Sequence, residues 1–287
     1  MSPSGETIEK GKENTENKEY TMVDPLPVSA IHPQAPEFLS ANALFSAAID
    51  LEQALAHMQR LWSFNVNGHW EHVESNAELG TPSGDLFTFK HADVVAMLTP
   101  VPGVVVPKKG QLPAHEFSVA MTFYVPMNND DLHAPMEVRR RHRQVAAHTL
   151  MVQVEDVLMR EESAVGVYRE ELGVVHPPLM VTTLADELTK GEAPLPLWVG
   201  IRTFQPDLTA GRTLGLNLFG HLDLEVRDST HPAEEVYELL ANVADYIVRS
   251  DAFLMPGQTL EYSHFGQLTL AQSVGLGDDA PLIRIGF

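Results

Sequence analysis

The sequence predicts an α+β fold in which mainly antiparallel, mixed sheets pack against about four helices. Several β-rich runs follow one another without a helix between them, and this order favours hairpins over parallel crossovers. Four further segments carry apolar residues at helical spacing. The chain has 287 residues and is 44% apolar, which is enough for a sizeable core. We therefore expect a single α+β domain over residues 37–287.

The first 36 residues differ from the rest in composition. Residues 1–24 carry six acids and three lysines, with Tyr20 as the only aromatic residue. Such a segment buries too little apolar surface to offset the entropy lost on ordering. Residues 25–36 are rich in proline and favour an extended linker. We predict a disordered acidic tail followed by a Pro-rich linker, and either Met1 or Met22 can be the start.

Two helices are expected in the first half of the domain. Leu51, Leu55, Met58 and Trp62 lie at i, i+4, i+7 and i+11 of one helical stripe, and Asp50 with Gln53 suits an N-cap. A longer helix is expected from near Pro135 to about Glu161. The residues that form its buried face are Ala147, Leu150, Met151, Val154, Val157 and Leu158.

Two more helices are expected later in the chain. A short one is marked by apolar residues at helical spacing and ends at Gly191. The last one begins near Ser229 to Pro232. Their apolar stripes are Val181, Leu184, Ala185 and Leu188 for the first, and Val236, Leu240, Val243 and Ile247 for the second.

The strand predictions come from runs with alternating or continuous apolar residues between turn signals. These runs are 85–99, 116–125, 164–168, 197–204, 213–227, 259–262, 267–273 and 282–287. The chain ends inside the last of them. We therefore expect that trimming the C-terminus destabilises the fold.

The most regular run is LGLNLFGHLDLEV, residues 214–226. Its apolar residues fall mainly at even positions, while His221, Asp223 and Glu225 fall at odd ones. This alternation predicts one strand with a face on the core and with a bulge at Gly220. The polar face is then a solvated surface. The alternative is a catalytic or metal site, because paired carboxylates and a histidine suit acid–base chemistry or a divalent cation.

A second candidate is GHWEHVE, which contains His69 and His72. Two histidines three residues apart share a face on a helix but point to opposite sides of a strand. The flanking Asn65, Asn67 and Gly68 favour a turn or a strand, and the H-E-x-x-H zinc pattern is not matched. We expect ordinary surface histidines, with a metal site as the alternative.

The third candidate is the basic cluster in the long predicted helix. It consists of Arg139, Arg140, Arg141 and Arg143, with His142 between them. In an acidic chain these side chains are expected to pair internally. The alternative is a docking patch for an anionic partner.

Composition excludes several classes of function. The formal net charge of −20 disfavours binding to nucleic acid or to an anionic membrane surface. The chain has no cysteine, so disulfides, thiolate metal sites and a cysteine nucleophile are excluded. We find no secretory signal, and the most apolar run, 94–106, is too short to span a membrane. We expect a cytoplasmic protein.

Two short motifs resemble known sites but lack the required context. AQSVG around Ser273 resembles a nucleophile elbow, yet no histidine follows His264 to complete a triad. GLGDDA at 275–280 resembles a dinucleotide fingerprint, yet Pro281 and a strand follow where a helix is needed. No cofactor is therefore predicted.

The order of longer motifs resembles the bacterial domain-of-unknown-function family 4261. The segments that carry the resemblance are ADVVAMLTPVPG, HEFSVAMTFYV, LPLWVGIRTF, TLGLNLFGHLDLEV and VADYIVRSDAFLMPGQTL. The resemblance extends over most of 36–287 and implies one compact α+β domain. Leu98 stands where the family usually has methionine, and the N-terminal tail is additional. His115, Phe219, Gly220 and Asp223 correspond to motif positions, and no catalytic residue is implied.

These observations lead to a functional hypothesis and two alternatives. The leading hypothesis is a binding or regulatory module, of an immunity-like or adaptor kind, whose acidic surface engages a basic partner. The first alternative is a metal-assisted, hydrolase-like enzyme that uses His221, Asp223 and Glu225. The second is a structural subunit of a homo-oligomer, which requires a large apolar surface patch.

Overall fold

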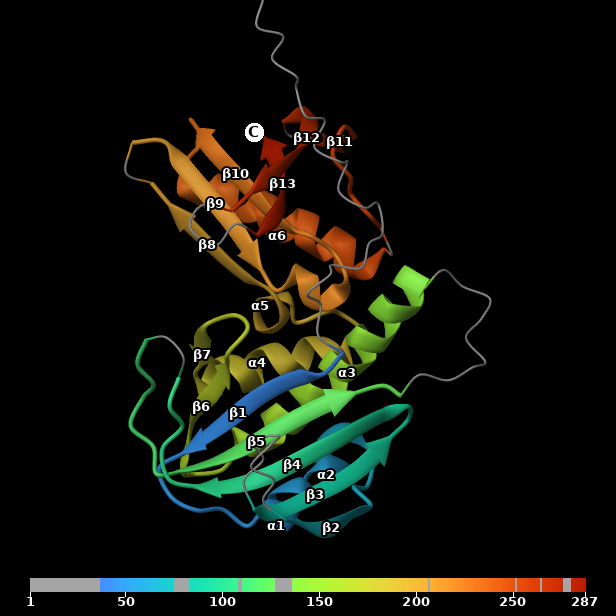
Figure 1. The fold of residues 1–287 in the computed structure, drawn as a ribbon, viewed down its shortest axis with the longest axis vertical. Coiled ribbons are helices and arrows are strands. Elements are labelled where there is room, and N and C mark those ends of the chain that lie inside the picture. The colour runs from blue at the N-terminus through green and yellow to red at the C-terminus, as the bar shows by residue number, and fades with distance from the viewer. Residues whose placement is uncertain are drawn as a thin grey trace, which may run out of the picture.

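Two β-sheets with helices against them form the molecule (Figure 1). The computed structural model describes residues 37–74, 83–107, 110–126, 136–205, 207–250, 252–263, 265–275 and 280–287. The tail and linker predicted for residues 1–36 lie outside this part of the chain. Within it, the mixture of antiparallel sheets and helices confirms the α+β fold class.

The first sheet contains, among the described residues, seven strands in the order β2-β3-β4-β5-β1-β6-β7. All of its paired neighbours are antiparallel. Alternate residues of the central strands are buried on one side, as the period of two requires. The strands are β1 (Leu39–Phe45), β2 (Gly68–Val73), β3 (Gly84–His91), β4 (Val94–Pro102), β5 (Phe117–Tyr124), β6 (Ala164–Arg169) and β7 (Val174–His176).

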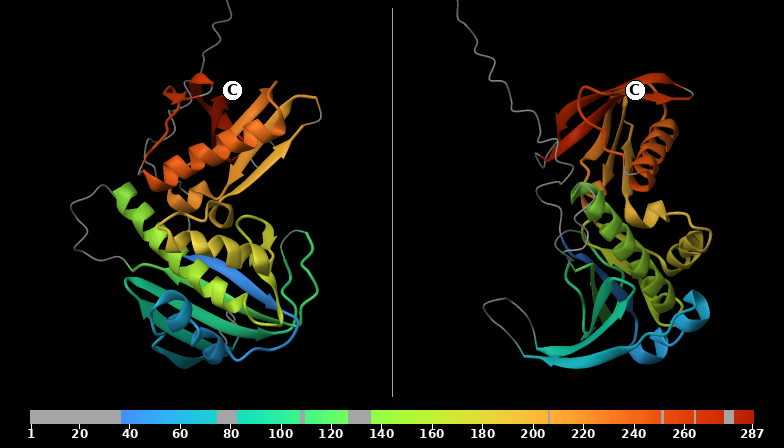
Figure 2. Two further views of the ribbon diagram at one scale, coloured as in Figure 1. Left: turned by 180° about the vertical axis from the view of Figure 1, so that it is seen from behind. Right: turned by 90° about the vertical axis from the view of Figure 1, so that its right-hand side faces the viewer.

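Helices cover the buried side of this sheet (Figure 2). They are α1 (Leu51–Leu55), α2 (Met58–Trp62), α3 (Met136–Leu158) and α4 (Pro178–Thr189). The Asp50 carboxylate accepts a hydrogen bond from the Gln53 backbone N–H at 3.0 Å, which confirms the N-cap. The single helix expected from this cap is interrupted after Leu55 and continues as α2. All six residues of the buried face predicted for α3 are buried.

The second sheet contains, within the described segments, six strands in the order β11-β12-β13-β10-β9-β8. Strands β10 and β13 pair in parallel, and the other neighbours pair antiparallel. The strands are β8 (Gly200–Phe204), β9 (Thr209–Leu214), β10 (Asp223–Ser229), β11 (Thr259–Tyr262), β12 (Gly266–Val274) and β13 (Pro281–Gly286). Helix α6 (Ala233–Arg249) packs on one face of this sheet, on the same side of the molecule as α3 and α4 (Figure 2).

The two sheets meet through short helical elements and share one apolar core. Helix α5 (Leu195–Trp198) and the 3₁₀ helix η2 (Leu216–Phe219) lie at the junction. Trp198 and Phe219 are buried there, with ring centroids 5.8 Å apart. The buried apolar residues of both halves form one continuous cluster. The single domain predicted for residues 37–287 stays a prediction.

The predicted strand over 213–227 is wrong in its middle. The chain leaves β9 at Leu214, forms η2 and enters β10 only at Asp223. Gly215 has φ +109° and Gly220 has φ +75°, so a left-handed residue bounds η2 on each side. The leucine row therefore belongs to two strands and a helical turn. In residues 216–219 the alternation of leucines therefore does not indicate a strand.

Candidate functional site

The polar positions of 221–227 are mostly buried, contrary to the expected solvated face. His221 is 3% exposed and Glu225 is 4% exposed. The chain reversal through η2 turns His221 into the junction of the two halves. Residues 223–229 then run through the centre of the second sheet, between β9 and β13. Burying a polar side chain costs free energy unless it forms a hydrogen bond or an ion pair, so each of these side chains needs such a partner.

The imidazole of His221 connects two backbone segments. Its Nδ1 lies 2.6 Å from the Leu222 carbonyl oxygen, and its Nε2 accepts from the Leu254 N–H at 3.1 Å. This pattern requires a neutral ring with the proton on Nδ1. Burial lowers the pKa of His221 to about 4. His221 therefore ties the end of η2 to the segment after α6.

The Asp223 carboxylate organises the start of η2. Its Oδ1 accepts from the Thr213 hydroxyl at 2.9 Å and from the Leu216 N–H at 3.0 Å. The Thr213 oxygen also accepts from the Leu224 N–H at 2.8 Å. Burial raises the pKa of Asp223 to about 6, although these hydrogen bonds favour the charged form. Asp223 thus holds β9, η2 and β10 together.

Glu225 has partners of its own. One carboxylate oxygen accepts from the Ser273 hydroxyl, and the other lies 2.7 Å from Nη2 of Arg227. The three side chains proposed as an enzymatic site are therefore bound to different partners. No group of three or more metal-ligating side chains that could hold an ion occurs among the described residues. Ser273 supports Glu225 in this arrangement.

The two histidines of the second candidate lie on the edge strand β2. His69 Nε2 lies 2.9 Å from Glu71 Oε1, and His72 Nδ1 lies 2.8 Å from Asp85 Oδ1 on β3. Because they are three residues apart on a strand, the histidines point to opposite sides of the sheet. The structure does not bring them together. The preference for a turn or a strand at this position is confirmed.

The basic cluster divides between the interior and the surface. Arg139 and Arg140 lie in the first turns of α3, and their side chains fall outside the described part of the structure. Arg143 is half-buried. Arg141 is completely buried and donates to backbone carbonyls of the second half, at 3.3, 3.0 and 2.7 Å from Phe219, Ile247 and Ala252. Its partners thus include three backbone carbonyl groups, where the sequence suggested carboxylates.

A buried polar seam along α3 was not predicted. Arg141, His148 and Glu155 repeat every seven residues and share one face of the helix. His148 stacks on Phe219, with ring centroids 4.6 Å apart, and both of its ring nitrogens lack a hydrogen-bond partner. Burial and then the charge of Arg169 lower its pKa well below 6.5. The sequence did contain a sign of this seam, because these polar residues recur within an otherwise apolar stripe of the helix.

One ion pair further along α3 extends this seam to the first sheet. Glu155 Oε2 accepts from Arg169 Nη2 on β6 at 3.1 Å, and both side chains are buried. Burial lowers the pKa of the neighbouring His176 to about 4, and the charge of Arg169 contributes. These groups fix β6 and β7 against α3. They stabilise structure and offer no open site.

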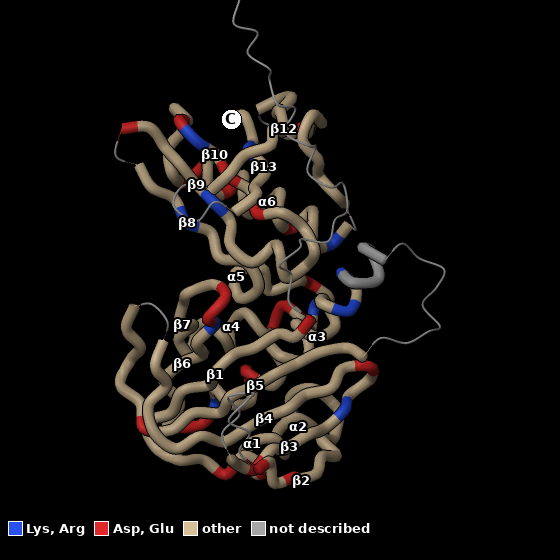
Figure 3. Tube along the Cα trace, in the orientation of Figure 1, with Lys and Arg blue, Asp and Glu red and all other residues tan. Residues whose placement is uncertain are grey.

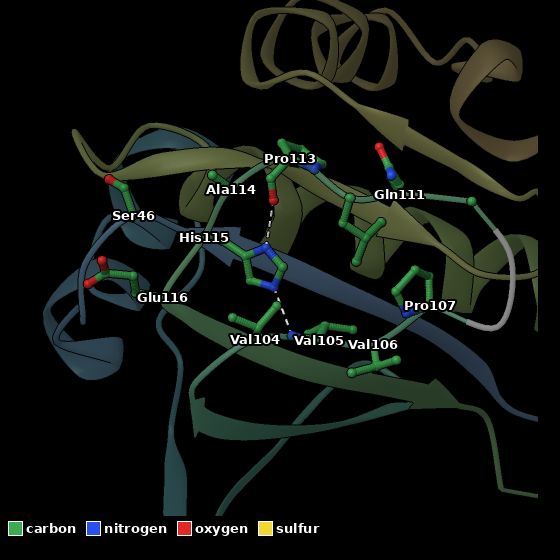
Figure 4. A pocket seen from close by; sticks show the side chains of 12 residues that line it. Ser46, Val104, Val105, Val106, Pro107, Gln111, Pro113, Ala114, His115 and Glu116 are labelled. Carbon is green, nitrogen blue, oxygen red and sulfur yellow. Dashed lines mark hydrogen bonds between the residues drawn. The ribbon is translucent and has the colours of Figure 1, made fainter.

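The loop between β4 and β5 lines an open pocket of about 630 Å³ (Figure 4). His115 closes the loop: its Nε2 accepts from the Val105 N–H at 2.8 Å, and its Nδ1 lies 2.7 Å from the Pro113 carbonyl oxygen. Val104 and Val106 on the rim are 67% and 87% exposed. The loop includes residues 108 and 109, which lie outside the described residues. His115, one of the motif positions, therefore acts as a clamp within its own loop.

The helical side of the second half is acidic. The outer surface of α6 carries Tyr237 and Tyr246, which are 42% and 48% exposed. Acidic residues near the end of α4 continue this surface, since Glu192 acts electrostatically on Arg249 at the end of α6. We call this surface the acidic helical face. Its carboxylates are Asp186, Glu187, Glu192, Glu234, Glu235, Glu238 and Asp245.

Comparison with known proteins finds a family model that is similar to part of this chain. The model of the family described as "Domain of unknown function (DUF4261)" matches residues 212–285. The family resemblance is confirmed for these residues. We call residues 212–285 the DUF4261 segment. It begins in β9, includes η2 and α6, and ends in β13.

The DUF4261 segment covers the last two of the five motifs that suggested the family. Asp223, Phe219 and Gly220 lie inside it, and His115 lies outside. The resemblance of the earlier motifs stays a prediction. No curated protein and no solved structure matches the chain. No helix in the described ranges has both the length and the apolar character needed to cross a membrane.

Proposed function

We propose that this protein is a binding module whose acidic helical face engages a basic polypeptide partner. The composition of that face is the observation that carries the proposal. Within the described residues, the only Lys or Arg side chains of α4, its C-cap and α6 are Lys190 at that C-cap and Arg249, which lie 2.8 Å from carboxylates of Glu187 and Asp245. The remaining carboxylates attract a basic surface and accelerate its association.

The exposed tyrosines support a protein partner over a simple ion. Tyr237 and Tyr246 are nine positions apart on α6, half a turn around the helix axis, so they flank the outward row of carboxylates on its two sides. Tyrosine is enriched at interface centres because it buries a large ring and keeps a polar tip. The face thus combines long-range charge with side chains suited to close contact.

An immunity-like or adaptor role in the cytoplasm suits this surface. Inhibitors of basic toxins and adaptors both gain from fast electrostatic capture. The hydrolase-like alternative has no supporting observation among the described residues, because His221, Asp223 and Glu225 each bind separate structural partners. We therefore do not propose catalysis.

Affinity capture with charge-reversed variants tests the proposal. The tagged protein should capture a basic partner from a lysate at physiological salt and lose it when the salt is raised several-fold. The double variant Glu234→Lys/Glu238→Lys should lose the same partner. Glu71→Lys/Glu74→Lys on the edge of the first sheet is the matched control and should retain it. Capture that resists salt, or an equal loss in both variants, would contradict the proposal.

A further inference from the structure

The face of the second sheet opposite α6 carries four arginines. A Cβ added to Gly211 would meet Val236 and Leu240 of α6, so Gly211 and its strand partner Thr203 face the helix. Residues one position away on these strands therefore point to the opposite side. Arg202, Arg212, Arg227 and Arg284 all lie on that side by register. We call this surface the arginine face, and Figure 3 shows its basic residues on these strands.

Three of the arginines lie in one row across neighbouring strands. In the strand register, Arg202 on β8 lies opposite Arg212 on β9. Arg212 lies opposite Glu225 on β10, and Glu225 lies opposite Arg284 on β13. Arg227 lies two residues further along β10 on the same face. Neighbouring strands are about 4.8 Å apart, so the row spans about 14 Å.

Two acids contact arginines of this face: Glu225 lies 2.7 Å from Arg227, and Asp228 lies near Arg284. The Glu225 side chain is 5% exposed, whereas those of Arg227 and Arg284 are 22% and 42% exposed. Arg284 contacts Asp228 only at 3.4 Å, which is longer than an ordinary hydrogen bond. Arg202 is exposed and donates to the Leu172 carbonyl at 3.1 Å, which positions its guanidinium. Asp228 is itself 75% exposed, so the positive excess of this face comes from its four arginines outnumbering Glu225 and Asp228.

We propose that the arginine face binds a small ligand that carries two or more phosphate groups. Guanidinium groups recognise phosphate through paired hydrogen bonds, and all four cations here are arginine. The rest of a chain of net charge −20 repels anions. A long polyanion would extend beyond the row into this repulsion, while a compact ligand stays within roughly one to two screening lengths of the arginines. Phosphates supply the most charge in such a small volume.

An exposed aromatic residue borders the row and suits an organic ring on the ligand. Phe204 is 70% exposed and lies two residues after Arg202, on the same face of β8. A flat ring can stack on it while the phosphates contact the arginines. Inorganic polyphosphate and a nucleoside triphosphate share the phosphate chemistry, and only the second uses Phe204.

Titration calorimetry with inorganic tripolyphosphate tests the site on the full chain. Saturable binding is expected for the unchanged protein. The variant Arg202→Gln/Arg284→Gln should bind about tenfold more weakly or worse, and Arg60→Gln/Lys90→Gln on the first half is the control with the same charge change. Thermal unfolding of each variant confirms that it is folded. No saturable binding, or equal weakening in both variants, would overturn the proposal.

Further ligands separate the possible sources of the anion. If a nucleoside triphosphate binds more tightly than tripolyphosphate and Phe204→Ala removes only that gain, the ligand has a ring. Equal binding of the two supports an inorganic phosphate ligand. Tighter binding of a hexaglutamate peptide or of single-stranded oligonucleotide than of either phosphate compound would overturn the proposal in favour of a macromolecular partner.

Discussion

Arg141 is the single residue on which the junction of the two halves depends most directly. It is completely buried and donates to the carbonyls of Phe219, Ile247 and Ala252, and its guanidinium lies 4.0 Å from the centroid of the Phe253 ring. Replacement by methionine removes these donors and leaves buried carbonyls without partners. We expect Arg141→Met to lower the free energy of unfolding by about 3 kcal/mol. Urea denaturation at neutral pH measures this change.

The control for this prediction is an arginine that makes no such contacts. Arg60 lies exposed on α2, and Arg60→Met should change stability by less than about 0.5 kcal/mol. A similar small effect of Arg141→Met would show that the carbonyls find other donors or water. The arginine would then be dispensable for joining the halves.

At the scale of elements, the turn from β9 into η2 depends on Gly215. Its φ is +109°, and an added Cβ would lie 2.6 Å from Leu172 Cδ2 and 3.0 Å from the Trp198 carbonyl oxygen. We expect Gly215→Ala to lower the free energy of unfolding by about 2 to 4 kcal/mol, because the strained backbone and the clash add. Gly257 has φ +87° and no atom within 4 Å of an added Cβ. Gly257→Ala should therefore lose only about 1 kcal/mol, and equal losses in the two variants would exclude the clash.

The same turn explains where sequence reasoning failed. Helices with a long apolar stripe were predicted well, since the buried face of α3, the end of α4 and the start of α6 follow from local spacing and from glycine and proline positions. Leu216, Leu218 and Phe219 fitted a strand equally well. Only tertiary packing of Phe219 against His148 and Trp198 selects the helical turn. Burial of His221 and Glu225 follows from that packing, so local alternation could not reveal it.

At the scale of the whole molecule, charge is sorted onto different surfaces. Acids gather on the outer sides of α4 and α6, while the arginines of the second sheet lie on the face opposite α6 (Figures 2 and 3). The composition predicted the net charge but not which surfaces carry the acidic and the basic residues. Sheet register gathers the four arginines on one face, with Glu225 among them, because alternate residues of β8, β9 and β10 face either α6 or the open side. Two ligands of opposite charge can thus be proposed for one acidic chain.

Buried titratable groups make stability depend on pH. Burial lowers the pKa of His176 and His221 to about 4 and that of His148 well below 6.5. The unfolded chain therefore binds these protons more readily, so the stability they contribute is complete above pH 6.5 and is lost as the pH falls toward 4. Asp223 acts in the opposite sense: its pKa of about 6 exceeds its ordinary 3.8, so its contribution is complete below pH 3.8 and is lost as the pH rises through 6.

Variants of two of these groups should change the pH profile in opposite directions. His148→Phe keeps a ring against Phe219 and removes one titration, so the loss of unfolding free energy from pH 7 to pH 5 should shrink, by at most about 2 kcal/mol. Asp223→Asn removes the opposing group and should enlarge that loss by about 1 kcal/mol. Urea denaturation of the three proteins at both pH values measures the differences. Identical losses would mean that neither group keeps its shifted pKa in the folded state, because the linkage fixes both signs.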